Sequence, residues 1–282
     1  MQWGQIKTVF IISFLVLDIF LLQQFLDKRN TDMAFISEPT LEESLQAEEI
    51  DYSQIPKEST EVSYITARRH QFTKEELESL GNQSIVIANG ETIFSELDEP
   101  LPIKEGEGMK ESLERMKANM AYGDQYVFWS WNKNEDRNVM ILFQQYDDKP
   151  VYYNGGGLIL LLLNEDNEVL YYVQTMLDDI QTENKEQEVQ PLKAIESLYH
   201  NNMLNSGDQI TKMELGYFTL IPLDNGIQVF SPTWKVNIND QKSFYVNAIE
   251  GQIIETDETT FIDEMLEKYL IKIDSTSWSE EE

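Results

Sequence analysis

One apolar run near the N-terminus constrains this chain more than any other feature. Residues 6–26 are almost entirely apolar, with Lys7 near the start of the run and Lys28 and Arg29 just beyond it. A helix of about 20 apolar residues is long enough to cross the hydrocarbon core of a bilayer. No small-residue cleavage site follows the run, and the chain has no cysteine to carry a lipid. We therefore predict an uncleaved transmembrane helix over residues 6–26.

The two sides of this predicted helix differ greatly in size. Residues 1–5 form a short tail, and the positive charges flanking the run nearly balance. Because a very short N-terminal tail is usually kept in the cytoplasm, we expect a single-pass cell-membrane protein whose bulk is extracytoplasmic. Residues 27–60 are rich in Glu, Ser, Gln and Asp and are predicted to form a stalk.

The net charge of the chain limits the kinds of partner that it can bind. The formal net charge is −30, and the acidic residues are spread along the whole sequence. Such a surface repels phosphate backbones, so we expect no nucleic-acid partner. The spread of the charge favours solubility or adaptation to salt, and attraction to cations or to a basic partner is the alternative.

Beyond the stalk, the sequence pattern repeats. A helix is predicted over residues 111–126 and another over 196–210, and both contain Glu-Ser-Leu followed later by Gly-Asp-Gln. A series of β-rich runs follows each helix. The constant offset between the two copies indicates a duplicated unit, and helices followed by antiparallel strands indicate an α+β fold. We therefore predict two similar helix-plus-antiparallel-sheet units, 61–182 and 183–282.

Local signals predict several elements within this scheme. Thr40 and Thr73 each stand three residues before a glutamate, which is the pattern of a capping box at a helix start. Asn89-Gly90 between two apolar runs predicts a hairpin. The apolar run Leu158–Leu163 is too short to span a membrane and predicts a buried central strand. A strand over 62–68 and a tight turn at Glu250-Gly251 are also predicted.

No motif in the sequence carries recognisable chemistry. The chain has two histidines and no cysteine, which are too few ligands for an ordinary zinc site. Gly155-Gly156-Gly157 lacks a following Lys-Ser/Thr and is interpreted as a loop before a strand. We predict no catalytic, cofactor-binding or metal-ligating residue. With 51 acidic residues, a catalytic carboxylate pair is neither identified nor dismissed. An aromatic cluster is interpreted as core packing, with a sugar or peptide platform as the alternative: Tyr126, Phe128, Trp129 and Trp131.

Both ends of the chain resemble one known family. Trp3, Lys7-Thr8, Leu17-Asp18 and Gln24-Phe25 match the start of the YycI family, and the stretch Pro232–Ile254 resembles its ending, with Pro-x-Trp and Tyr-Val-Asn-Ala. The resemblance implies an α+β fold related to the C-terminal part of YycH-like proteins. It also implies a non-enzymatic role, in which the protein acts with a YycH-like partner and a WalK-like sensor histidine kinase to tune cell-wall metabolism, largely through transmembrane contacts.

Asp18 fits such a role because it lies in the middle of the apolar run. A carboxylate at the bilayer centre costs about 2.5–3.5 kcal/mol and is rare unless it faces a partner. Simple tolerance of the charge, with the carboxylate protonated, is the alternative. In a helix one face carries Asp18 together with five apolar side chains, and we predict that this face binds a partner helix: Phe14, Leu15, Leu21, Leu22 and Phe25.

Three functions follow from these observations. The leading one is an accessory regulator of a sensor histidine kinase. The second is a tethered module of PepSY type that binds a peptide, a peptidase or a wall fragment. The third is an anchored wall-active enzyme, which would need a concave cleft with paired carboxylates of raised pKa.

Overall fold

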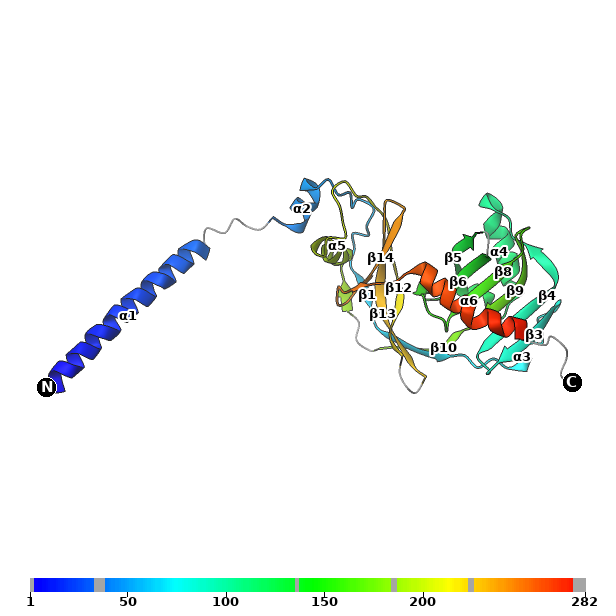
Figure 1. Cartoon of the computed structure of the whole chain (residues 1–282), viewed down its shortest axis with the longest axis horizontal. Helices are drawn as coiled ribbons and strands as arrows, with labels where there is room; N and C mark the ends of the chain where they lie inside the picture. The colour runs from blue at the N-terminus through cyan, green and yellow to red at the C-terminus, as the bar shows by residue number, and fades with distance from the viewer. Residues whose placement is uncertain (1–2, 33–38, 135–136, 184–186, 223–225, 276–282) are drawn as a thin grey trace. The chain divides into compact units, whose positions relative to one another are not determined.

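The computed structural model of the chain describes residues 3–32, 39–134, 137–183, 187–222 and 226–275 (Figure 1). The chain divides into two compact units, Met1–Glu49 and Ile50–Glu282. Both predicted α+β units, 61–182 and 183–282, lie within the second compact unit. The boundary between them stays a prediction.

The first compact unit contains two helices, α1 (Trp3–Asp32) and α2 (Leu41–Ala47). The capping box predicted at Thr40 is confirmed. The Thr40 hydroxyl accepts the Glu43 N–H at 3.2 Å, and the Glu43 carboxylate accepts the Thr40 N–H at 2.9 Å. These two bonds satisfy N–H groups that have no partner within a first helical turn, which is why the short α2 begins where it does.

The apolar run forms a helix, as predicted. At 1.5 Å per residue, α1 is about 45 Å long. Twelve large apolar side chains of α1 are between 48% and 66% exposed. Among the helical residues described, no helix is both long enough and apolar enough to cross a membrane.

The second compact unit is α+β, as predicted, and most of its strands share one large, mainly antiparallel sheet. The strands follow the order β10-β2-β13-β12-β7-β6-β8-β9-β4-β3, with β5 beside β6, β14 beside β13 and β15 beside β14. Their bounds are Ile65–Arg69 (β2), Gln83–Ala88 (β3), Thr92–Pro102 (β4), Tyr126–Lys133 (β5), Asn138–Tyr146 (β6), Lys149–Tyr152 (β7), Leu158–Leu163 (β8), Glu168–Gln174 (β9), Leu177–Thr182 (β10), Ile210–Pro222 (β12), Gln228–Ile238 (β13), Lys242–Asn247 (β14) and Ile253–Ile254 (β15).

Helices and a small ribbon complete this unit. β1 (Thr60–Val62) and β11 (Gln187–Val189) pair as a separate two-stranded sheet. The remaining elements are α3 (Lys74–Leu77), the 3₁₀ helix η1 (Gly106–Gly108), α4 (Met109–Lys117), the 3₁₀ helix η2 (Gly123–Gln125), α5 (Pro191–His200) and α6 (Glu258–Ser275). The α6 helix was not predicted from the sequence.

One parallel contact joins the two halves of the sheet. β7 pairs antiparallel with β6 and parallel with β12 through Tyr217–Val151 and Phe218–Tyr152. Every other strand pair in the sheet is antiparallel. The backbone of Gly216 makes this approach possible, because a Cβ there would lie 2.3 Å from the ring of Tyr152.

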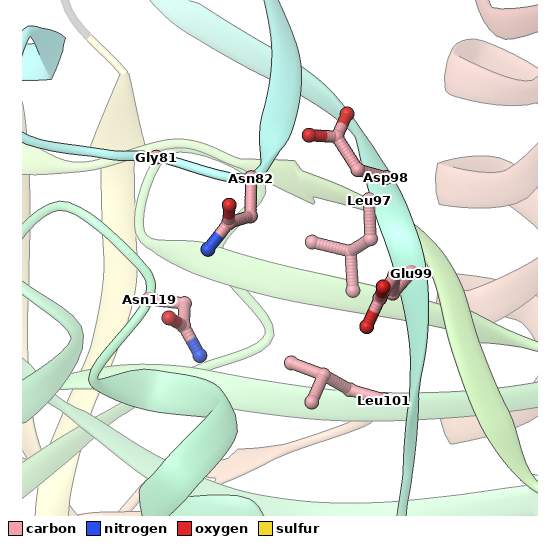
Figure 2. Close-up of a pocket in the computed structure, with 7 residues that line it drawn as sticks. All are labelled: Gly81, Asn82, Leu97, Asp98, Glu99, Leu101 and Asn119. Carbon is pink, nitrogen blue, oxygen red and sulfur yellow. The ribbon is translucent and has the colours of Figure 1, made fainter.

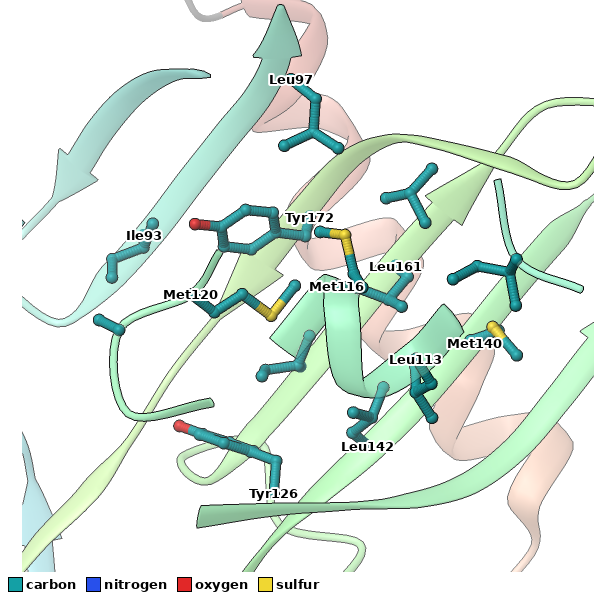
Figure 3. Packing of buried hydrophobic residues seen from close by; sticks show 14 of the residues in the cluster. Ile93, Leu97, Leu113, Met116, Met120, Tyr126, Met140, Leu142, Leu161 and Tyr172 are labelled. Atoms are coloured by element: carbon teal, nitrogen blue, oxygen red, sulfur yellow. The ribbon is translucent and has the colours of Figure 1, made fainter. Parts of the chain in front are cut away.

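The core lies on both faces of β8, which confirms the predicted central strand. Ile159 and Leu161 belong to the apolar cluster on the face covered by α4, and Figure 3 shows Leu113 and Met116 of that helix packed there. Leu158 and Leu160 belong to the cluster on the opposite face. Side chains of α6, the red helix of Figure 1, complete this second cluster: Ile262, Leu266 and Tyr269.

The two helices of the predicted repeat are shorter than the pattern indicated. α4 ends at Lys117. Further along the chain, Tyr122 has a left-handed backbone conformation (φ 53°) and leads into η2. Gly123 folds back so closely that a Cβ there would lie 2.1 Å from the Lys117 carbonyl oxygen. α5 begins at Pro191, a residue favoured at the first helical position, and ends at His200. The predicted helices over 111–126 and 196–210 were therefore wrong at their C-terminal ends, and both helices begin before the predicted start, α4 at Met109 and α5 at Pro191.

Candidate functional site

The helix face predicted to bind a partner lies wholly within α1. Asp18 is exposed, and the five apolar residues predicted with it are between 51% and 60% exposed: Phe14, Leu15, Leu21, Leu22 and Phe25. In a helix these positions fall on one side, because residues three and four apart are neighbours. Their binding of a partner stays a prediction.

Trp129 is the centre of a second group of side chains, where the two halves of the sheet meet. Its indole N–H donates to Glu258 Oε2 at 3.1 Å, and the Lys235 ammonium lies 3.9 Å from the centre of its ring. The Tyr153 hydroxyl donates to the same carboxylate oxygen at 3.3 Å and lies 3.3 Å from the Tyr245 hydroxyl. We call these five residues the Glu258 cluster.

Burial shifts the pKa values of Tyr153, Tyr245 and Lys235 in the Glu258 cluster. Desolvation raises the pKa of Tyr153 to about 12, and it also raises the pKa of Tyr245. Desolvation lowers the pKa of Lys235, against the opposing effect of Glu214 and Glu258. The tyrosines are therefore neutral hydrogen-bonding groups at neutral pH. Trp129, Tyr153 and Phe143 also pack edge to face or tilted at 5.1–5.7 Å, so the structure confirms core packing for Trp129.

His70 lies in a third group of side chains, which no sequence pattern predicted. It follows β2, and each of its ring nitrogens lies 2.9 Å from a carboxylate oxygen. Nε2 faces Glu76 of α3 and Nδ1 faces Asp178 of β10. The Tyr122 hydroxyl donates to Glu76 at 2.7 Å. We call these four residues the His70 cluster.

The two carboxylates of the His70 cluster have lowered pKa values. Burial would raise the pKa of Glu76, but hydrogen bonds from Thr73 and Tyr122 and the charge of His70 outweigh it and lower the pKa to about 2. The pKa of Asp178 is also lowered, by the Asp179 N–H and by His70.

Both ring nitrogens of His70 face carboxylate oxygens, so neither is free to act as a general base while these contacts are made. His200 is an exposed helical residue whose Nε2 lies 3.8 Å from Glu196. Among the described residues, no three His, Asp or Glu side chains are placed to hold a metal ion.

Two cavities on the described surface lie beside β3 and β4. The one in Figure 2 has a volume of about 350 Å³ and is lined by Asp98, Glu99 and Leu101 of β4 together with Asn82 and Asn119. Neither His70 nor Glu258 lines it. A second, of about 420 Å³, runs along β3 and is lined by Leu77, Leu80, Ile85 and Ile87 among others.

The His70 cluster predicts a dependence of stability on acid pH. Because the pKa of Glu76 is about 2 in the folded chain and 4.5 in its ordinary state, its stabilising effect is complete above pH 4.5 and is lost as the pH falls towards 2. Glu76→Gln should therefore lower the urea midpoint at pH 6, and the difference from the wild type should vanish near pH 2. Glu75→Gln, an exposed change in the same helix, is the control. An equal loss at both pH values would contradict the prediction.

Comparison with known proteins adds four findings. The family model described as YycI protein matches residues 31–249. Among solved structures, the chain is similar to the Bacillus megaterium YpeB C-terminal domain, at 12% identity and a TM-score of 0.39, over 65% of this chain and 92% of that one. It is also similar to YycH from Bacillus subtilis, at 13% identity and a TM-score of 0.37, over 73% of this chain and 54% of that one. None of the curated proteins matches.

Proposed function

The chain belongs to the YycI family, and on that premise we propose that it is a membrane-anchored accessory regulator of a WalK-like sensor histidine kinase. Family membership supports a role in the YycH/YycI system that regulates WalK. In this proposal the protein acts with a YycH-like partner, it influences cell-wall metabolism through the kinase, and it is not an enzyme.

The exposed apolar surface of α1 is the observation that carries the proposal. Twelve of its large apolar side chains are about half exposed or more. Exposure of apolar surface to water is unfavourable by about 25 cal/mol per Å². We therefore expect the exposed apolar side chains of α1 to be buried against lipid or protein. An anchor through residues 6–26, with residues 1–5 in the cytoplasm and the bulk of the chain outside, supplies that burial.

Asp18 gives the anchor a reason to bind other helices. A hydrogen bond between polar groups of neighbouring membrane helices is worth about 0.6–2 kcal/mol. Asp18→Leu removes the carboxylate and keeps the helix apolar. We expect it to weaken association with the kinase and the YycH-like partner by about 3–30-fold, which is this free energy expressed as an equilibrium constant. The measurement is co-purification of both partners with the full chain from membranes.

Two phenylalanines provide a matched test of the predicted face. Phe14 lies on the face of Asp18 and Phe20 on the opposite face, and both are exposed. Phe14→Ala should reduce co-purification, whereas Phe20→Ala should leave it unchanged. If Phe20 proves the more important of the two, the assignment of the face is wrong. If residues 50–282 alone retain full regulation, the tethered binding module replaces the anchor-based proposal.

A further inference from the structure

β3 ends the sheet with an edge that lacks the usual protection. It pairs with β4, and no other described strand pairs with it. Exposed edges invite pairing with other chains, and proteins protect them with charges, prolines, bulges or very short strands. β3 has six residues, Gln83–Ala88, with no charge and no proline. Its register with β4 is uninterrupted.

The other ends of the sheet show what protection looks like in this chain. β10 carries Asp178 and Asp179, and its pairing with β2 is broken by a register shift between Asp178 and Gln181. β15 has only two residues. β5 has a register shift between Phe128 and Ser130. The open edge of β3 is therefore an exception within its own fold.

A groove of mixed character lies along the same strand. Its volume is about 420 Å³, and four apolar side chains line it together with three polar ones: Leu77, Leu80, Ile85, Ile87, Lys74, Glu78 and Gln83. Both isoleucines are only partly buried. When an extended peptide adds to a sheet edge, main-chain hydrogen bonds supply affinity, and pockets for alternate side chains supply specificity. β3 offers an edge and a groove of this kind together.

Charge identifies the kind of segment that fits. Lys74 and Glu78 line the groove, and Glu75 beside them is exposed. Asp98 and Glu99 are also exposed and line the cavity next to Asn82, the residue before β3, so four exposed acidic residues and one lysine lie around this strand. Two copies of the chain would bring two such surfaces together, and like charges across an interface are unfavourable. A positively charged segment is attracted instead.

We propose that the edge of β3 binds an extended, positively charged segment of a partner protein, which adds as a further strand and places apolar side chains against Ile85 and Ile87. The inference does not depend on the proposed kinase regulation. Its test needs only the purified full chain and a peptide, so the two proposals fail separately.

The test uses a labelled peptide of alternating lysine and valine, titrated against the detergent-solubilised full chain by fluorescence anisotropy. We expect the peptide to bind and the matched glutamate–valine peptide not to bind. Hydrogen exchange followed by mass spectrometry should show slower exchange at residues 83–88 when the lysine–valine peptide is present. This measurement uses the unaltered protein and therefore does not depend on the folding of any variant.

Two matched variants locate the contact. Ser84 is exposed on β3 and Gln181 is exposed on β10, at the other end of the sheet. Ser84→Lys should weaken peptide binding at least 10-fold, and Gln181→Lys should change it less than 2-fold. The proposal is overturned by equal effects of the two lysines, by binding without protection of residues 83–88, by absence of binding, or by self-association of the chain through β3.

Discussion

Replacing Leu161 with alanine should lower the free energy of unfolding by about 2–5 kcal/mol, the usual range for a leucine in a closed core. Leu161 is 0% exposed and lies on β8, which has a strand on each side. Met116 of α4 and Leu142 of β6 belong to the same buried cluster (Figure 3). Removal of three carbon atoms leaves a cavity that a strand fixed on both edges cannot close. Urea unfolding followed by tryptophan fluorescence measures the loss.

Leu220 provides the matched control for this change. It lies on β12 and is 40% exposed, so Leu220→Ala removes the same atoms from a site that water already reaches. We expect a change within about 0.5 kcal/mol, which is typical of surface substitutions. Similar losses at both positions would show that β8 is not the rigid centre of the sheet.

The second large effect is expected at Gly216. A Cβ added there would lie 2.3 Å from the ring of Tyr152 and 2.6 Å from the carbonyl oxygen of Pro150. Tyr152 is 1% exposed and has no room to move away. Gly216→Ala should therefore lower the free energy of unfolding by about 1–3 kcal/mol, the usual cost of overpacking a core. Because the clash falls on the β7–β12 contact, the loss should be accompanied by faster hydrogen exchange at Val151 and Tyr152.

Gly81 is the control for the glycine change. A Cβ added at Gly81 would have no other atom within 4 Å, and the Gly81 backbone is not in the left-handed region. Gly81→Ala should leave the urea midpoint unchanged or raise it slightly, because alanine restricts the unfolded chain more than glycine does. If Gly216→Ala were equally harmless, the close approach of β7 and β12 would not be needed for folding.

Short-range signals in the sequence predicted much of the local structure. The capping box at Thr73 is present, with the Thr73 N–H donating to Glu76 at 2.7 Å. The Asn89-Gly90 hairpin joins β3 and β4, and both turn residues have positive φ. The turn at Glu250-Gly251 separates β14 from β15. In each case the residues that determine the conformation are neighbours in the chain, so the pattern is visible in one window.

Long-range pairing was not visible in the same way. The single strand predicted over 62–68 is divided in the structure between β1, which ends at Val62, and β2, which begins at Ile65. β2 pairs with β10 and β13, and the prediction gave no hint of either partner. The parallel β7–β12 contact depends on the absence of a side chain at Gly216, which a sequence pattern does not distinguish from a turn glycine. α6 was not predicted, although its buried side chains Ile262, Leu266 and Tyr269 recur at the helical spacing of four and three residues.

The candidate sites show the same difference between short-range signals and long-range pairing. The face of α1 around Asp18 was predicted from helical spacing alone, and the helix is confirmed. The His70 and Glu258 clusters were not predicted as groups. Asp178 is 108 positions from His70 and Glu258 is 129 positions from Trp129, so only the tertiary fold brings these residues together. No local signal marks either carboxylate among the 51 acidic residues of the chain.

The pairing of β2 with β13 has a consequence for the time at which the protein can fold. Ile65 is synthesised early, and its partner Phe230 follows only after most of the chain has been made. At about 5–20 residues per second, translation leaves β2 without this partner for on the order of ten seconds or more. During that interval the edge of β2 that will pair with β13 has no partner, whereas its other edge can pair with β10 once residues 177–182 have been made. Variants that weaken the β13 side of the sheet should therefore reduce the yield of protein in the cell before they reduce the activity of the molecules that complete folding.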